Sequence, residues 1–110
     1  MRFEWDEDKS FRNLRKHKVG FETAILVFDD PHALTQRDEW SEDEDRWITL
    51  GSALPGTVLY VVHTDRKPAG IETIRIITAR NATPREKRQY YEEAQQESKE
   101  RYRRSRSHER

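Results

Sequence analysis

The chain has 110 residues, of which 38% are charged and only 33% apolar, so it fits one domain with a small core. It has no cysteine, which excludes a disulfide framework and a thiolate zinc site and favours a reducing, cytoplasmic setting. No apolar run approaches the ~18–20 residues of a membrane span.

The zero net charge hides an asymmetry along the chain. Residues 1–45 carry 7 Lys and Arg against 13 Asp and Glu, a balance of −6. Residues 75–110 carry 11 against 6, a balance of +5. The basic part is therefore able to bind an anion locally although the whole chain is neutral.

The first third of the chain predicts a short strand and two helices. Residues 2–5 alternate as a strand, and Asp6 is a suitable N-cap for a helix that begins at Glu7. Phe11 and Leu14 give this helix an apolar stripe, and Gly20 helps to end it. A second helix is expected over residues 21–28, where one buried face combines Phe21, Ala24, Ile25 and Phe28.

The middle of the chain predicts β-structure. Residues 32–38 suit an edge strand and residues 40–45 an acidic loop. Three longer strands are expected at 46–54, 57–66 and 71–80, separated by the short turns 55–56 and 67–70. Short turns between successive strands favour an antiparallel meander.

The last element carries a clear start signal. Thr83, Pro84 and Glu86 have the spacing of a capping box, which predicts a helix from residue 84 to about 100. The expected fold class is α+β: two N-terminal helices, an antiparallel sheet of about four strands and a C-terminal helix. We divide the chain into a domain of residues 1–92 and a basic, partly disordered helical extension of residues 93–110.

Arginines in the two longest strands point to phosphate. Side chains alternate between the faces of a strand, so Thr64 and Arg66 share a face, and Thr78 and Arg80 share one with Ile74 and Ile76. The same alternation directs Arg75 to the other face, and antiparallel pairing puts the two Thr-x-Arg pairs at opposite ends. Surface ion pairs explain any single arginine, but the set favours phosphate binding, which suits the guanidinium fork.

Three further groups are candidates for the site. His17 with Lys16 and Lys18 offers a general acid or base, although capping of the helix dipole explains these residues equally well. Of Tyr90 and Tyr91, one is expected in the core and the other is free to stack on a base. His63 and Asp65 give only two ligands, which favours an exposed ion pair and predicts no metal site.

An ordered series of motifs extends over residues 2–92. It comprises "FEWDEDK", Asn13, "KH" at 16–17, "F..A..VF.DP" at 21–31, Arg46, "T.R" at 64–66, "IRIITAR.A" at 74–82 and "E...Y" at 86–90. In this series the chain resembles the BrnT family of toxins from type II toxin–antitoxin systems. The resemblance implies a fold similar to the RelE ribonucleases and toxicity through metal-independent RNA cleavage and translation arrest, with no cofactor.

The resemblance also implies partners and roles. The partners are RNA and a BrnA-like ribbon-helix-helix antitoxin, whose complex represses its own operon, so operator DNA is contacted through the antitoxin. The oligomeric state is left open between a monomer, a dimer and a toxin–antitoxin heterotetramer. The expected catalytic residues are Arg66, Arg80, His17, Lys16 and Tyr90, and the expected RNA contacts are Thr64, Arg75, Thr78, Lys18 and Tyr91. The alternative function is a non-catalytic module that binds nucleic acid or protein.

Overall fold

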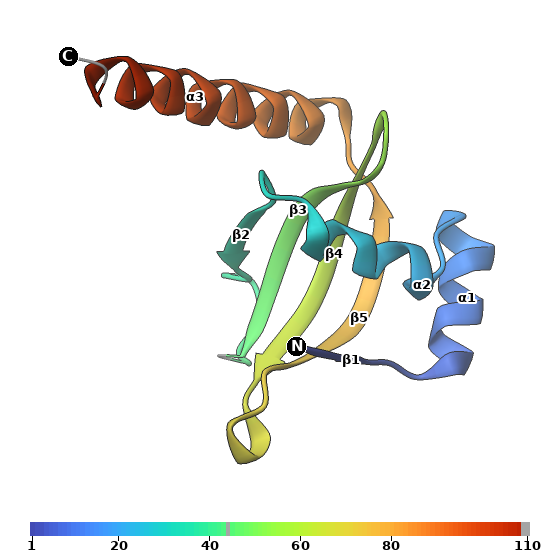
Figure 1. The fold of residues 1–110 in the computed structure, drawn as a ribbon. Coiled ribbons are helices and arrows are strands. Elements are labelled where there is room, and N and C mark those ends of the chain that lie inside the picture. The colour runs from blue at the N-terminus through green and yellow to red at the C-terminus, as the bar shows by residue number, and fades with distance from the viewer. Residues whose placement is uncertain (44, 109–110) are drawn as a thin grey trace.

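The computed structural model describes residues 1–43 and 45–108, which form an α+β fold (Figure 1). Five strands form one sheet in the order β1-β5-β4-β3-β2. The strands are β1 (Arg2–Glu4), β2 (Leu34–Arg37), β3 (Arg46–Leu54), β4 (Thr57–Arg66) and β5 (Thr73–Asn81). The helices are α1 (Glu7–His17), α2 (Phe21–Ala24), η1 (Ile25–Asp29), η2 (Pro68–Gly70) and α3 (Pro84–His108).

The sheet confirms the predicted meander and adds one parallel strand. Neighbouring strands from β2 to β5 pair antiparallel. The N-terminal strand β1 pairs in parallel with β5, so the sheet is mixed and the prediction of a wholly antiparallel sheet was wrong in this respect. Such a pairing joins strands that are about 70 residues apart, which no local sequence signal reveals.

A β-bulge in β5 changes which side chains share a face. Val62 of β4 pairs with Thr78, but the next residue, His63, pairs with Ile76, so Ile77 is an extra residue in β5. Thr78 and Arg80 therefore lie on the face opposite Ile76. The predicted face shared by Ile74, Ile76, Thr78 and Arg80 was wrong, because unbroken alternation does not survive a bulge.

Helix α1 presents its polar side to the core. Asp6 caps the helix as predicted and accepts hydrogen bonds from the backbone N–H groups of Asp8 and Lys9. The buried residues are Ser10 and Asn13, whereas Phe11 is 69% and Leu14 46% exposed. The predicted apolar stripe thus faces solvent, because Asn13 is needed to bond the open edge of β5.

The second helical segment tightens into a 3₁₀ turn. After α2 the chain continues as η1, so residues with a spacing of three, Phe21, Ala24 and Val27, all become fully buried. They pack with Leu59, Val61, Ile74, Ile76 and Ala79 in the main core. A Cβ atom at Gly51 of β3 would lie 2.8 Å from the Cβ of Val27, so glycine permits this close approach.

Helix α3 lies across one end of the sheet and projects beyond it (Figure 1). It extends to His108 rather than ending near residue 100, since no Gly or Pro interrupts residues 85–108. Two contacts fix it to the turn before β2: the Tyr90 hydroxyl donates to Asp30, and His32 pairs with Glu97 at 3.0 Å. None of the helices in the described ranges is long and apolar enough to cross a membrane.

Asp30 connects this turn to both α3 and β3. Burial alone would raise the pKa of the Asp30 carboxyl, but hydrogen bonds from the Ser52 N–H, the Tyr90 hydroxyl and the His32 N–H outweigh it and lower the pKa. The Tyr90 ring is buried against Leu50 and Val58. Tyr90 therefore anchors α3 to the domain.

Replacing Tyr90 by Phe should lower the free energy of unfolding by about 2 kcal/mol near neutral pH, since the hydrogen bond to an ionised group is removed. The pKa of Asp30 is depressed in the folded protein, so this stabilisation is complete above the unfolded value near 3.8 and disappears as the pH falls through the folded value. Urea unfolding between pH 7 and pH 3 measures the difference.

The matched control is Tyr91→Phe, because Tyr91 is 46% exposed on the same helix. It should change stability by less than about 0.5 kcal/mol. Equal effects of the two substitutions would contradict the anchoring role of Tyr90.

Candidate functional site

Five of the ten predicted site residues lie on one face of the sheet, opposite α2 and η1: Thr64, Arg66, Arg75, Thr78 and Arg80. The register aligns side chains across neighbouring strands of this face in successive rows. The rows are Leu50–Tyr60–Arg80, Ile48–Val62–Thr78, Arg46–Thr64–Arg75–Glu4 and Arg66–Thr73–Arg2. Because of the bulge at Ile77, Arg75 and Arg80 share this face, which corrects the prediction that they point in opposite directions.

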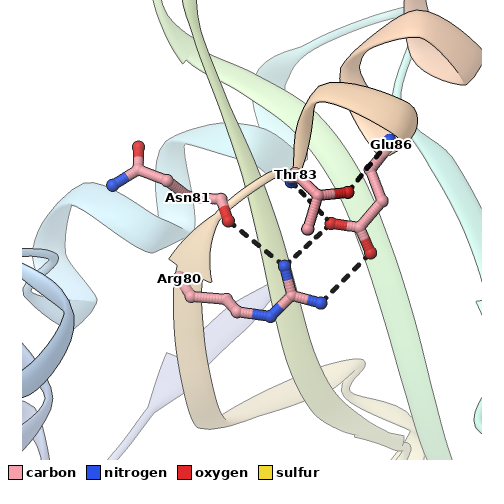
Figure 2. Close-up of polar contacts among 4 residues, drawn as sticks. All are labelled: Arg80, Asn81, Thr83 and Glu86. Atoms are coloured by element: carbon pink, nitrogen blue, oxygen red, sulfur yellow. Dashed lines mark hydrogen bonds and ion pairs between the residues drawn. The ribbon is translucent and has the colours of Figure 1, made fainter.

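Arg80 is held on three sides at the start of α3, and Figure 2 shows its contacts with Glu86 and Asn81. Its Cζ atom lies 3.8 Å from the centroid of the Tyr60 ring. Its Nη1 and Nη2 atoms donate to the two carboxylate oxygens of Glu86, at 2.8 and 3.1 Å, and Nη1 also donates to the Asn81 carbonyl. The guanidinium group is therefore fixed in one orientation.

Glu86 has two roles in this arrangement. Its carboxylate accepts from the Thr83 N–H at 2.9 Å, while the Thr83 hydroxyl accepts from the Glu86 N–H at 3.2 Å. This is the capping box predicted from the sequence. The residue that caps α3 thus also orients Arg80, which connects the helix start to the site.

One edge of the Arg80 guanidinium remains available. Arginine has five N–H donors, and the contacts with Glu86 and Asn81 engage three of them. The other two, Nε–H and the second hydrogen of Nη2, point in parallel along the same edge, where the neighbouring Tyr60 hydroxyl is the one further group of the described residues that interacts with Arg80. This edge faces away from Glu86 in Figure 2. It has the geometry that binds two oxygens of a phosphate.

The ionisation states suit this geometry. The hydrogen bonds from Arg80 hold the pKa of Glu86 below its usual value, and the Glu86 carboxylate raises the pKa of Arg80. Burial raises the pKa of the neighbouring Tyr60 hydroxyl. At neutral pH the site therefore contains a charged pair beside an uncharged phenol.

The basic end of α1 lies beside the end of β5. The Asn13 amide donates 2.7 Å hydrogen bonds to the carbonyls of both Val19 and Ala79. These bonds tether the end of α1 and the turn up to Val19 next to β5, the strand that carries Arg80. The predicted residues Lys16 and His17 are the last two of α1, and Lys18 is its C-cap. His17 is half-buried, the two lysines are exposed, and Lys18, rather than Gly20, adopts the left-handed conformation that ends the helix, with φ 63°.

The other predicted arginines lie farther along the same face. Thr64 pairs with Arg75, and Arg66 pairs with Thr73 one row beyond. Arg66 and the row of Arg80 are separated by six residues of β4, or about 20 Å at ~3.3 Å per residue. This distance is too large for Arg66 and Arg80 to contact one phosphate.

Two further predictions are changed by the structure. Tyr90 is 4% exposed and donates its hydroxyl to Asp30 at 2.5 Å, so it is the core member of the tyrosine pair and is occupied in anchoring α3. Tyr91 is the exposed member of the pair, as an RNA contact requires. Thr78 lies on the site face, but its hydroxyl donates to Asn13 at the edge of β5.

His63 is a core residue and forms no ion pair with Asp65. It is 2% exposed and bonds Thr49 at 2.7 Å, and burial lowers its pKa. The expectation of an exposed ion pair was wrong because the face of β4 that carries His63 lies beneath Phe28. Among the described residues, no group of three or more His, Asp or Glu side chains is arranged to hold a metal ion.

Sequence reasoning missed three residues on or beside this face: Tyr60, Glu86 and Arg46. Tyr60 lies four residues before Thr64 in the same strand, so alternation puts both side chains on one face. This was the available sequence signal that Tyr60 belongs to the site face. Glu86 was assigned only to the helix cap, and Arg46 only to a motif. Their roles depend on pairing across strands, which a single sequence does not give.

Comparisons with known proteins agree with this picture. A family model described as "Ribonuclease toxin, BrnT, of type II toxin-antitoxin system" matches residues 5–86, a span that includes Tyr60, Arg80 and Glu86. The crystal structure of the Brucella abortus ribonuclease toxin BrnT matches with a TM-score of 0.56 and 24% identity, over 76% of this chain and 97% of that chain. A comparison with curated proteins found no match. The fold is thus shared with a solved BrnT structure, and since the family model spans more than half of the chain, this protein belongs to the BrnT family of ribonuclease toxins of type II toxin–antitoxin systems.

Proposed function

We propose that this protein is a metal-independent endoribonuclease that cleaves RNA at the site around Arg80 and thereby arrests translation. The observation that carries the proposal is the edge of the Arg80 guanidinium with two parallel donors, Nε–H and Nη2–H. Tyr60 and Glu86 hold this guanidinium in place. A phosphodiester offers two oxygens at the spacing of this edge. The family assignment supplies RNA as the substrate.

The proposed reaction is attack by the 2′-hydroxyl of the RNA on the adjacent phosphorus. The O2′–P bond forms, the P–O5′ bond breaks, and a 2′,3′-cyclic phosphate and a 5′-hydroxyl result. One proton leaves the 2′-hydroxyl and another is delivered to O5′. Negative charge increases on the phosphate oxygens in the transition state, where the fixed Arg80 edge stabilises it.

We assign proton transfer to the basic end of α1. An imidazole is a common general acid or base, and Asn13 tethers the end of α1, which carries His17, beside the strand that carries Arg80. Lys16 is the second proton carrier proposed, while Lys18 and Tyr91 are exposed and suited to contact RNA. A His17→Gln protein that keeps the wild-type pH–rate profile would exclude His17 from this role.

Replacing Arg80 by Ala should lower the rate of RNA cleavage by about 100-fold or more, the usual effect when a fixed transition-state donor is removed. Arg80→Lys should restore little, since an ammonium group cannot form the two parallel hydrogen bonds. Cleavage of a labelled RNA under single-turnover conditions measures both variants. Thermal unfolding shows whether they remain folded.

The control is Arg12→Ala, because Arg12 is exposed on α1, outside the site face. It should cleave at the wild-type rate. Wild-type cleavage by folded Arg80→Ala would remove Arg80 from the mechanism. RNA binding without any cleavage by the wild-type protein would instead support the alternative of a non-catalytic binding module.

The family also implies an antitoxin partner. We propose a BrnA-like antitoxin with a ribbon-helix-helix segment, which binds operator DNA for the complex. Expression of this chain should arrest bacterial growth, and co-expression of the protein encoded beside it should restore growth. The Arg80→Ala variant should not arrest growth although it still binds the antitoxin, which co-purification measures. Continued arrest during co-expression would contradict this partner assignment.

A further inference from the structure

We propose that four arginines at the far end of the site face form a second phosphate subsite, which binds the RNA backbone away from the bond cleaved at Arg80. These residues, the distal arginine cluster, are Arg2, Arg46, Arg66 and Arg75. The subsite rests on the proposed function, because it assigns the cluster to the same RNA strand.

The register arranges the cluster in two similar rows. Arg46 and Arg75 lie on either side of Thr64, and Arg66 and Arg2 lie on either side of Thr73. Neighbouring strands are ~4.8 Å apart, so each arginine pair is about 10 Å apart at the backbone. Each row therefore has a short central hydroxyl side chain between two long cationic ones.

This arrangement leaves a hollow in the surface. A pocket of about 420 Å³ is lined by Thr64 and Thr73, which are each only 6% exposed, and by Arg2, Arg66 and Arg75 among others. Glu4 and Pro68 complete the lining, so the pocket combines three arginines with two buried threonines and one carboxylate. A backbone phosphate fits such a hollow, where several cations surround it without a need for base-specific contacts.

The guanidinium groups of the cluster are only partly satisfied by the protein. In the part of the chain that the structure describes, the one hydrogen bond that they donate is from Arg66 Nε to Asp45, at 3.1 Å. Arg75 lies 3.6 Å from Glu4 in an ion pair, and Arg66 lies 3.8 Å from Asp43. The Nε atom of Arg46 is buried without a partner. Within the described residues, Arg2, Arg75 and the other donors of Arg66 thus make no hydrogen bond to the protein, whereas the buried Nε of Arg46 is not open to an anion.

The ion pairs with carboxylates are weak competitors for a phosphate. The side chains of these pairs are 40–58% exposed, and exposed pairs contribute only about 0–1 kcal/mol each. A phosphodiester that contacts several arginines and releases counterions gains more than this. RNA should therefore displace Glu4, Asp43 and Asp45 from the cluster.

The position of the cluster favours RNA over an acidic protein segment. It lies on the same face as Arg80, and its two rows are about 13 and 20 Å away along β4 at ~3.3 Å per residue. The row between contains Ile48, Val62 and Thr78, with no charged side chain. One extended strand that reaches both ends would have one phosphate at Arg80 and others in the cluster.

A 12-nucleotide 2′-O-methyl RNA tests the subsite without cleavage, since it has no attacking hydroxyl. The Arg2→Gln, Arg75→Gln double variant should bind it at least tenfold more weakly at 0.1 M salt. The slope of log K against log salt should decrease by about 1.4, or ~0.7 for each phosphate that the protein no longer neutralises. Arg66→Gln, tested separately, should decrease it by about 0.7.

Arg12→Gln is the matched control and should change neither quantity. The double variant should also bind RNA more weakly in a protein in which Arg80 is replaced by Ala, because the two sites bind different phosphates. Thermal unfolding verifies that each variant is folded.

Unchanged RNA affinity and an unchanged salt slope in the arginine variants, or no RNA binding by the wild-type protein, would overturn the subsite. Weaker antitoxin binding with unchanged RNA binding would overturn it too and identify a protein-docking surface. The proposed function fails separately, if wild-type protein leaves cleavable RNA intact.

Discussion

The carboxylate of Glu86 is the group on which the site depends. It accepts the Thr83 N–H and so completes the cap of α3, and it accepts two hydrogen bonds from Arg80. Both interactions use an ionised acceptor, which strengthens them. Because the same group fixes the first turn of the helix and the direction of the guanidinium, α3 cannot start elsewhere without releasing Arg80. The fold and the proposed chemistry are joined at this residue.

The β-bulge at Ile77 is the second constraint. It turns Thr78 and Arg80 to the face that already carries Arg75, while Ile74 and Ile76 remain in the core. Without the extra residue, either Arg80 would enter the core or the two isoleucines would face solvent. The bulge thus lets β5 keep Ile74, Ile76 and Ala79 in the core while Arg75 and Arg80 share the opposite face, and it is what places both arginine groups along one surface.

Local signals predicted much of the fold. The capping box and the N-cap at Asp6 were predictable because their hydrogen bonds join residues at most three positions apart. The bulge and the parallel pairing of β1 were not, since both are properties of paired strands. Periodicity also failed for α1, where the polar Asn13 is turned inward to satisfy the backbone of β5. When a helix turns a polar residue inward in this way, its apolar stripe faces solvent instead of the core.

The candidate site also combines local features that the sequence predicted with long-range contacts that it did not. Arg80 was predictable as a strand-end cation, but its partners were not: Tyr60 comes from the neighbouring strand and Glu86 from a helix cap. The choice between Tyr90 and Tyr91 depended on the rotation of α3 about its axis, which the hydrogen bond to Asp30 fixes. Sequence therefore indicated which residue types belong to the candidate site better than how they are arranged.

The central claim is that a fixed arginine edge, with the RNA's own 2′-hydroxyl as the nucleophile, is sufficient for cleavage. End-group analysis of the fragments formed from a defined RNA in the presence of EDTA tests it most directly. We expect a 2′,3′-cyclic phosphate on one fragment and a 5′-hydroxyl on the other, in the same yield with and without EDTA. Fragments with a 3′-hydroxyl and a 5′-phosphate, or a failure to cleave in EDTA, would contradict the claim.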